Sequence, residues 1–427
     1  MKRWSHSLAG WMVCPFFLLV AFAVAFVARF VSHAGSPRLV WGSTPIINYA
    51  YWSKAMRAAG YYSETYTTSF YERINQRSDW DRILLEEYPR IPNRIKPLVA
   101  FVSSLIKYDV FFISFDGYFI GGWPFAFFQA SILKFARKKV VVIAYGGDSY
   151  VYRRVRSTGT LHGLMMSYPL AAKRQTRVAH TVDYWCENAN AVIPGIMGPD
   201  GFGRWDVLLH SSLAIDLDKW VVSKRASTAD GWNGTVVISH SPNHRGFKGT
   251  EFLLAAIDQL RSEGLKVELQ LLEGMQNSEV RRILSEETDI LVEALICNGH
   301  GMSGLEGMAS GLPTITNLED DSYMLPVRRW SYFEECPLVS ASPETITSVL
   351  RKLITRPDLR HTLSRASRAY VEKYHGLDSA AFLFGEVIQY VYGKRESLIN
   401  LYHPLLGNYS HRLPRVDHPL VNSRIID

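Results

Sequence analysis

The strongest constraint on the fold is a pattern of short apolar strands that alternate with helices and end in loops rich in glycine. The predicted strands lie at 39–41, 107–115, 139–144, 235–239, 267–271 and 290–292. Apolar strands separated by helices are typical of parallel sheets that are covered on both faces. The pattern therefore predicts an α/β protein whose ligands bind beyond the carboxyl ends of its strands.

Two such sheets fit within one chain. A length of 427 residues allows two domains with full cores, and 47% hydrophobic and 20% charged residues are ordinary globular values. The polar stretch 223–234 is the best candidate for a boundary. We therefore expect an N-terminal domain at 36–222, a C-terminal domain at 223–378 and an irregular tail at 401–427.

Charge and cysteine content narrow the range of partners. The net charge of +7 favours anionic partners, such as nucleoside diphosphates, acidic lipid surfaces or nucleic acid. The sequence has no long Lys/Arg block and no nucleic-acid motif, so we predict that nucleic acid is not a partner. The four cysteines are widely scattered and show no metal-ligand spacing, and we predict no metal site.

One uncharged apolar run spans residues 10–28, close to the roughly 20 residues that cross a bilayer. This run predicts a membrane anchor or membrane-dipping segment within residues 1–35. A cleaved signal peptide and a buried core helix are the alternatives. Lys2 and Arg3 precede the run and Arg29 follows it, so the charge bias does not decide the topology.

The stretch 298–313, NGHGMSGLEGMASGLP, indicates a glycine-broken loop, a short helix and a tight exit. Ser303 is a good N-cap, Glu306 has the capping-box spacing, and Gly311 lies where a helix C-cap glycine belongs. A loop that presents free backbone N–H groups at a helix N-terminus is a natural anion site. We expect this one to hold the diphosphate of a sugar nucleotide.

The second half resembles the retaining GT-B glycosyltransferases of the "glycosyl transferases group 1" type, family four. The resemblance rests on HSPNHRGFKGTEFLLAAIDQL, VELQLLEG, GHGMSGLEGMASGLPTI and the segment 343–374, with a looser match at KKVVVIAYGGD. It implies two Rossmann-like domains that face each other across a cleft. The acceptor would bind to the N-terminal domain and the donor to the C-terminal domain, with residues 379–400 crossing back.

The same resemblance assigns several donor-site residues. Lys248 takes the place of the diphosphate-binding lysine, and Glu306 that of the glutamate that accepts hydrogen bonds from the donor ribose. The arginine usual five residues before the lysine is replaced by Asn243, and Arg245 either supplies that charge or faces solvent. Asn298 replaces a glutamate that contacts the donor sugar, which places the sugar specificity in doubt.

The remaining predicted site residues are backbone contacts and one carboxylate. Gly301, Met302 and Ser303 would present N–H groups to the donor, and Gly42 lies in a turn that approaches the diphosphate in such enzymes. Asp148 either orients or deprotonates the acceptor hydroxyl, or simply forms a turn. With Lys248 and Arg245, Asp148 completes the predicted catalytic set.

The sequence thus predicts a membrane-associated retaining glycosyltransferase, with its catalytic domains on the cytoplasmic face. It would transfer a sugar from a nucleoside-diphosphate donor to a lipid-linked or polysaccharide acceptor, without a cofactor. Asn298 and Asn243 support one alternative, a non-catalytic relative that binds glycans or scaffolds a complex. A sugar-nucleotide epimerase, which can share this fold, is the other.

Overall fold

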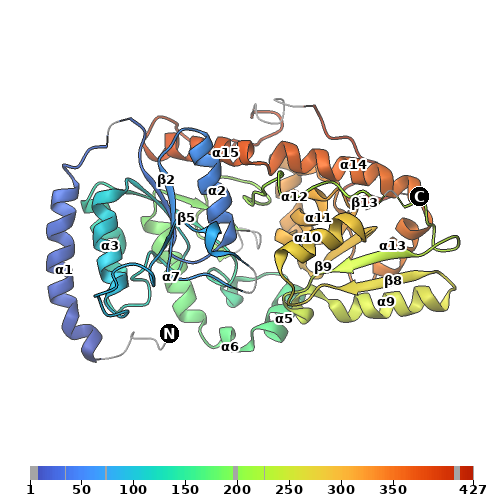
Figure 1. Ribbon diagram of the computed structural model, residues 1–427, viewed down its shortest axis with the longest axis horizontal. Helices are drawn as coiled ribbons and strands as arrows, with labels where there is room; N and C mark the ends of the chain where they lie inside the picture. Colours follow the sequence, from blue (N-terminus) through green and yellow to red (C-terminus); the bar gives the residue numbers. More distant parts are fainter. Residues whose placement is uncertain are drawn as a thin grey trace.

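The computed structural model describes residues 8–33, 35–72, 75–195, 201–225, 227–407 and 414–426. Figure 1 shows two α/β domains side by side, with the N-terminal domain at the left and the C-terminal domain at the right. Each domain is built around one parallel sheet. The predicted α/β class with two parallel sheets is confirmed.

The N-terminal sheet has six parallel strands in the order β3-β2-β1-β4-β5-β6. The strands are β1 (Leu39–Trp41), β2 (Ser63–Thr67), β3 (Arg82–Ile83), β4 (Val110–Ile113), β5 (Lys139–Ile143) and β6 (Ala191–Ile193). This is the order of the Rossmann fold, in which the direction of chain progression reverses between β1 and β4. A ligand crevice is expected at that reversal.

Helices cover both faces of the N-terminal sheet. The helices of this half of the chain are α1 (Leu8–Ala28), α2 (Ile47–Ala58), α3 (Lys96–Lys107), α4 (Gln129–Phe135), α5 (Thr158–Ser167), α6 (Pro169–Ala172) and α7 (Gln175–Asn188). Helix α5 does not cover this sheet but packs against α8 (Arg245–Lys248) and the strand Ile290–Asn298 of the C-terminal domain. Leu39 and Trp41 of β1 pack in one core with α2, whereas Val40 packs in another core with α3, α4 and α7. Successive residues of a strand point to opposite faces, so an uninterrupted apolar strand supplies both cores.

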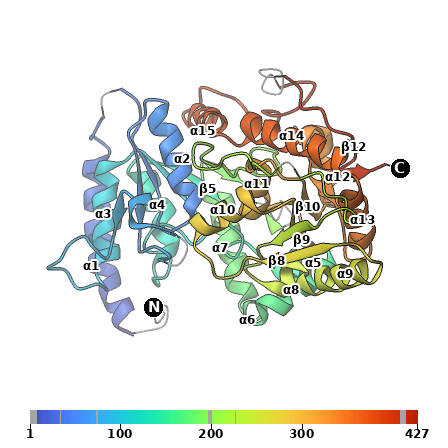
Figure 2. The ribbon, with the colours of Figure 1, turned by 45° about the vertical axis from the view of Figure 1, so that its right-hand side comes forward.

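The C-terminal sheet has five parallel strands in the order β11-β10-β9-β7-β8. They are β7 (Val236–His240), β8 (Val267–Leu271), β9 (Ile290–Asn298), β10 (Thr314–Asn317) and β11 (Val339–Ser340). Chain progression reverses between β7 and β9, which gives this domain a crevice of its own. Figure 2 shows this sheet and its helices on the right, apart from α1, α3 and α4 on the left.

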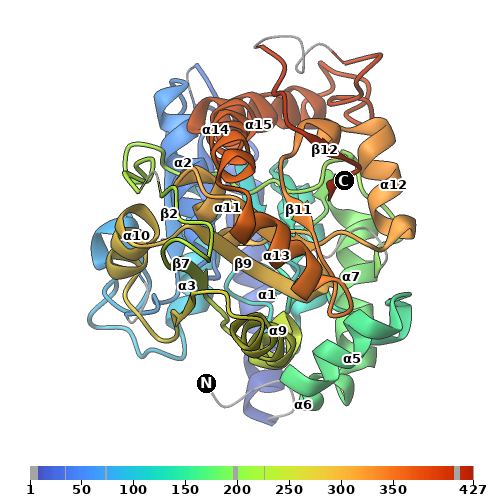
Figure 3. The ribbon, with the colours of Figure 1, turned by 90° about the vertical axis from the view of Figure 1, so that its right-hand side faces the viewer.

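The C-terminal helices also form two layers. They are α8 (Arg245–Lys248), α9 (Thr250–Ser262), α10 (Asn277–Glu286), α11 (Met302–Ala309), α12 (Asp321–Trp330), α13 (Ile346–Thr355), α14 (Pro357–Tyr374) and α15 (Leu377–Val391). Ile290 and Val292 share a core with α9 and α13, whereas Leu291 shares the other core with α10 and α11. Figure 3 shows α14 and α9 on opposite sides of β9.

The C-terminal end of the chain returns to the N-terminal domain. Helix α14 packs against α11, and α15 packs against α2 of the other domain (Figure 1). Phe384 of α15 meets Trp41 edge to face, with 4.8 Å between the ring centroids, and Trp41 stacks on Phe112 at 3.8 Å. One hydrophobic core therefore runs from the N-terminal sheet through α15 into the C-terminal domain.

Shortening Phe384 to alanine should loosen this connection. The ring is fully buried against Trp41 and Phe112, so Phe384→Ala should lower the unfolding free energy by about 3–5 kcal/mol. Urea denaturation followed by tryptophan fluorescence would measure the change. Phe127→Ala is the control, because the side chain of Phe127 is half exposed, and its effect should stay within about 0.5 kcal/mol.

The predicted N-terminal apolar segment forms α1, which packs against α3 and α4 at the outer edge of the domain (Figure 1). Cys14, Phe17 and Ala21 are buried on its inner side. Among the helices of the described residues, none combines the length and apolar character needed to cross a membrane. The prediction of a transmembrane helix is therefore not supported.

The tail is more regular than expected. Two short strands, β12 (Leu420–Val421) and β13 (Arg424–Ile425), pair antiparallel. The backbone N–H of Ser340 in β11 donates to the carbonyl of Ser423 at 2.7 Å, which joins this hairpin to the edge of the C-terminal sheet. Hence part of the 401–427 segment belongs structurally to the C-terminal domain.

Candidate functional site

A cavity of about 660 Å³ lies between the two domains, where the reversals in strand order face each other. Residues that follow β1 and β5 line it from the N-terminal domain, and residues that follow β7 and β9 line it from the C-terminal domain. Carboxyl ends of parallel strands at such reversals are the usual binding positions in α/β folds. The cavity is therefore the candidate functional site.

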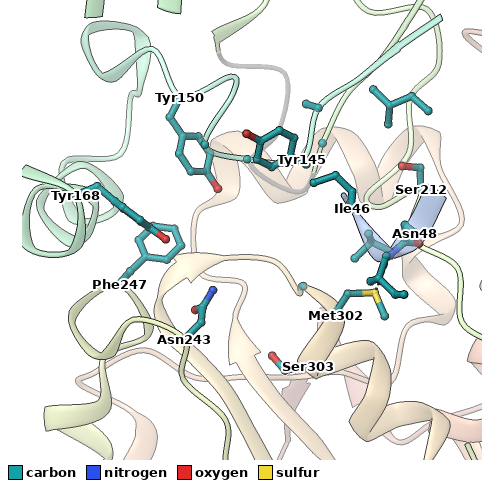
Figure 4. A pocket seen from close by; sticks show the side chains of 18 of the residues that line it. Ile46, Asn48, Tyr145, Tyr150, Tyr168, Ser212, Asn243, Phe247, Met302 and Ser303 are labelled. Atoms are coloured by element: carbon teal, nitrogen blue, oxygen red, sulfur yellow. Dashed lines mark hydrogen bonds between the residues drawn. The ribbon is translucent and has the colours of Figure 1, made fainter. Parts of the chain in front are cut away.

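The two walls of the cavity differ in chemistry. Figure 4 shows Tyr145 and Tyr150 on one side of the space, with Asn243 and Ser303 on the opposite side. The N-terminal wall is largely aromatic and aliphatic: Ile46, Ile47, Tyr49, Trp52, Tyr145 and Tyr150. Tyr152 and Tyr168 pack in one cluster with Phe247 of the C-terminal domain. The C-terminal wall brings polar and cationic groups beside Phe247 and Met302: Ser241, Asn243, Lys248 and Ser303. One wall thus suits an apolar or ring-shaped group, and the other suits an anion.

Asn48 connects these walls. Its side-chain N–H₂ lies 2.9 Å from the sulfur of Met302, and its carbonyl oxygen accepts from the backbone N–H of Ala214 at 2.7 Å. Helix α2 begins at Ile47, and its N-cap Ile46 makes no side-chain hydrogen bond. Asn48, in the first turn of α2, therefore joins the N-terminal domain to the segment at Ala214 and to α11.

Lys248 reaches the cavity wall from the end of α8. Its ammonium lies 3.1 Å from Oε1 of Glu293, and the side chains of both residues are largely buried, 11% and 1% exposed. Burial alone would lower the pKa of Lys248, but the Glu293 charge outweighs it and the pKa is raised. The ammonium therefore remains charged at the edge of the cavity.

Gly301, Met302 and Ser303 all line the cavity, as expected of the donor loop. The capping box, however, is absent: Gly301 is the N-cap of α11 and makes no side-chain capping bond. Ser303 instead donates its hydroxyl to Oε1 of Glu293 at 3.3 Å, and the Gly301 N–H donates to the same oxygen at 2.5 Å. A carboxylate from the neighbouring strand has replaced the local cap.

Three other predicted donor residues have different surroundings. Asn243 lines the cavity and is exposed. Arg245 does not line it, and forms an ion pair with Glu273 at 2.6 Å on the surface. The Asn298 amide donates to Thr160 at 3.4 Å and to Asp320 at 3.5 Å, outside the cavity lining. The structure thus brings Asn243 together with Lys248, but places Arg245 and Asn298 elsewhere.

Glu306 lies one turn into α11, half-buried behind the residues that line the cavity. Its carboxylate accepts from the side-chain amide of Asn277 at 3.1 Å. Burial raises the pKa of Glu306 to about 7, with the Glu293 charge adding to the effect against the Asn277 hydrogen bond. The ribose role that the resemblance assigns to this residue stays a prediction.

The raised pKa predicts how stability depends on Glu306. A carboxyl that binds a proton more tightly in the folded state destabilises the fold as pH rises from about 4.5 to about 7. Glu306→Gln removes this effect and keeps the acceptor for Asn277. Relative to the wild type, the variant should melt higher at pH 8 but not at pH 5, as measured by differential scanning fluorimetry. An equal loss of stability at both pH values would contradict the assignment.

Gly42 and Asp148 support the backbone around the cavity but do not line it. A Cβ at Gly42 would lie 2.0 Å from the carbonyl oxygen of Tyr66, so only glycine permits this approach of β1 to β2. Asp148 is buried and accepts from the backbone N–H groups of Phe115, Tyr145 and Gly146 at 3.0–3.1 Å. Burial, together with the charge of Asp116, raises the pKa of Asp148 to about 7.

Possible metal ligands are scattered in the structure. All four cysteines are buried and unpaired by disulfides. Within the described ranges, no group of three or more His, Cys, Asp or Glu side chains is placed to hold a metal ion. His240, near the donor loops, is fully buried between the carbonyl of Val292 and the hydroxyl of Thr250, so its ring serves to join β7 to its neighbours.

Sequence reasoning missed Glu293, Asn48 and the aromatic wall. A signal for Glu293 was available, since an ionised residue within the apolar run ILVEAL must find a cation or a set of donors when it is buried. The tyrosines carried no such signal, because Tyr150 lies in the loop after β5 and Tyr168 directly follows α5, whose packing on the C-terminal domain depends on residues far apart in the chain.

No protein-family model matches the sequence, and a search of curated proteins finds no match. Solved structures are similar in fold. Sucrose-phosphate synthase from Thermosynechococcus elongatus has a TM-score of 0.55 at 14% identity, covering 84% of this chain and 100% of that one. A glycosyltransferase from Rickettsia africae has a TM-score of 0.51 at 10% identity, covering 84% and 100%. The likeness establishes the GT-B fold, two facing Rossmann-like domains.

Proposed function

We propose that this protein is a retaining glycosyltransferase that transfers a sugar from a nucleoside-diphosphate donor to a hydroxyl of a lipid-linked or glycan acceptor. The observation that carries the proposal is the charged ammonium of Lys248 at a cavity built from the strand ends of both domains. The similar solved structures include a sucrose-phosphate synthase and a glycosyltransferase, and this likeness supports sugar transfer as the general chemistry.

The donor belongs on the C-terminal wall. A buried cation and hydroxyl donors offset the negative charge of a diphosphate, and Lys248 supplies the cation at the cavity. The Ser303 hydroxyl donates to Glu293 in the structure and would turn to the phosphate when the donor binds. Asn243 adds an amide that can both donate and accept. Arg245 would contribute only if donor binding drew it away from Glu273, so in our proposal Lys248 is the principal phosphate contact.

The acceptor belongs on the N-terminal wall. Tyr145 and Tyr150 present large apolar ring bodies with polar tips, which suit the faces and hydroxyls of a sugar or the start of a lipid carrier. The Tyr145 hydroxyl donates to Asp116 at 2.8 Å, which fixes the ring at the cavity. This division agrees with the partition of acceptor and donor that the family resemblance implies.

Catalysis in this site would rest on charge stabilisation and positioning. As the bond between the sugar and the diphosphate breaks, negative charge develops on the leaving phosphate, and Lys248 lies where it can stabilise that charge. Holding both substrates between two walls lowers the entropic part of the barrier. We assign Asp148 to holding the loop that carries Tyr145, because three backbone N–H groups occupy its carboxylate.

Replacing Lys248 tests the donor site. Lys248→Ala should weaken binding of a nucleoside diphosphate by roughly tenfold to a hundredfold, the effect of one lost charge-assisted hydrogen bond. Calorimetric titration with uridine, guanosine and adenosine diphosphates would measure it. Ser303→Ala, which keeps the buried ion pair, should cause a smaller loss, and Lys266→Ala is the control because it removes an exposed cation of the same domain. Failure of the wild type to bind any of these nucleotides would refute the donor site.

We also propose that α1 lies along a membrane surface with its outer face in lipid. No charged residue occurs in α1, and one stripe is exposed: Met12 (79%), Phe16 (71%), Leu19 (70%) and Phe26 (54%). The opposite stripe packs on α3 and α4, so the helix has one face for the protein and one face without a partner among the described residues. A large exposed apolar stripe of this kind marks an interaction surface.

Charge on this stripe should detach the protein from membranes. The double variant Phe16→Glu/Leu19→Glu should reduce sedimentation with phosphatidylcholine–phosphatidylglycerol vesicles by more than roughly tenfold, since each large apolar side chain contributes about 1.5–3 kcal/mol on burial. Leu405→Glu/Leu406→Glu is the matched control, because these leucines are 86% and 67% exposed on the tail. Equal sedimentation of the two double variants would show that α1 is not the lipid contact.

Two observations favour a second candidate function, a non-catalytic relative that binds a sugar nucleotide or glycan. Arg245 and Asn298 lie outside the cavity, and Glu293 already neutralises Lys248 within the protein. A protein of this kind would bind a nucleoside diphosphate but would release none from a nucleotide sugar. Measuring diphosphate release from nucleotide sugars in the presence of lipid-linked acceptors distinguishes the two functions.

A further inference from the structure

A single carboxylate organises the donor wall from behind. Glu293 lies within β9, with its side chain 1% exposed, and does not line the cavity. Its Oε1 accepts from three groups that do line the cavity: the ammonium of Lys248 at 3.1 Å, the N–H of Gly301 at 2.5 Å and the hydroxyl of Ser303 at 3.3 Å. One buried oxygen therefore joins α8, the loop after β9 and the first turn of α11.

The other oxygen, Oε2, is packed against α11. It has no hydrogen-bond partner among the described residues, and a Cβ at Gly304 would lie 1.9 Å from it. A glycine is therefore required at this point of α11 for the carboxylate to fit. The N-terminal end of a helix carries partial positive charge, so α11 adds to the stabilisation of the Glu293 anion.

The charge of Lys248 depends on this anion. The titratable groups that interact with the Lys248 ammonium are Glu293 and Cys297 from β9, Tyr168, His240 of β7 and His300. Among them, Glu293 is the group that makes a hydrogen-bonded ion pair with Lys248. A lysine buried without such a partner gives up its proton far more readily, because a low-dielectric surrounding disfavours the ammonium.

We propose that Glu293 is a positioning residue for the donor: it holds Lys248 at the cavity wall in its protonated form and orders the Gly301–Ser303 turn. The inference rests on the proposed function, because it concerns the same lysine and the same donor. It assigns Glu293 no contact with the substrate. The carboxylate projects from the middle of a central strand and accepts from Lys248, Gly301 and Ser303, so in this proposal it supports the phosphate contact instead of competing for it.

A stability measurement tests the charge coupling without any ligand. In Glu293→Gln, Lys248 loses its anion and its pKa falls, so the unfolded state binds more protons and the variant gains stability as pH rises. The unfolding free energy of Glu293→Gln should be lower than that of the wild type, and this stability deficit should shrink between pH 7 and pH 10. The double variant Lys248→Met/Glu293→Gln keeps Cys297 and Tyr168 but lacks the lysine, and its deficit should stay constant. A deficit that is the same at every pH in both variants overturns the coupling.

A binding measurement tests the role toward the donor. The wild type should bind a nucleoside diphosphate with similar affinity from pH 7 to pH 9.5. The affinity of Glu293→Gln should fall at least tenfold between these two pH values, because Lys248 deprotonates. An equal loss at every pH would indicate a purely structural role, and tighter binding would show that Glu293 competes with the phosphate; either result overturns the proposal. Glu263→Gln, an exposed carboxylate paired with Arg351, is the control.

The two measurements also separate this inference from the proposed function. A wild type that binds no nucleoside diphosphate refutes the donor site, and the role of Glu293 toward the donor falls with it. The stability measurements would in that case still report whether Glu293 keeps Lys248 charged. If the wild type binds and the pH profile of Glu293→Gln is flat, the proposed function stands and the inference about Glu293 fails.

Discussion

The structure depends on the fact that all strands of the six-stranded sheet and of the five-stranded sheet run in parallel. Parallel strands end at one edge, and the loops that follow them must gather there. In this protein the ends of β1 and β5 and the ends of β7 and β9 reach the same cavity from opposite sides. The shared core around Trp41 and Phe384 holds these edges together, because α15 returns from the C-terminal domain and packs on α2.

Burial of the pair of Lys248 and Glu293 has an energetic cost. Each charge loses its hydration, and removal of one partner from such a pair typically destabilises a protein by about 3–5 kcal/mol. The hydrogen bonds from Gly301 and Ser303 to Glu293 offset part of the cost. What this site gains is a lysine that stays protonated beside an apolar cavity, where an isolated ammonium would lose its proton.

Local sequence patterns predicted several central strands of both sheets, but not β2, β3 or β11, and only the first three residues of β9. Apolar runs such as 139–144 became buried central strands because their side chains can pack on both faces of a sheet. Gly311 lies just after α11 with a φ of +66°, as expected for a residue that ends a helix. These features depend on neighbours close in the chain, which is why the sequence alone sufficed.

Contacts between distant residues escaped prediction. Ser303 and Glu306 have the spacing of a capping box, but the Ser303 hydroxyl and the Gly301 N–H donate to Glu293 of β9 instead. Arg245 is only three residues from Lys248, yet Glu273 draws its side chain away from the cavity. Spacing along the chain shows which groups are near one another, whereas the partner that each charge finds depends on how the elements pack.

A crystal structure of the protein soaked with a nucleoside diphosphate tests the central claim most directly. Our account predicts the diphosphate within hydrogen-bonding distance of the Lys248 ammonium and the Ser303 hydroxyl, with Glu293 unmoved behind them. The aromatic wall that contains Tyr145 and Tyr150 should remain open for an acceptor. A nucleotide bound outside the cavity between the domains, or one that displaces Glu293 from Lys248, would contradict the account.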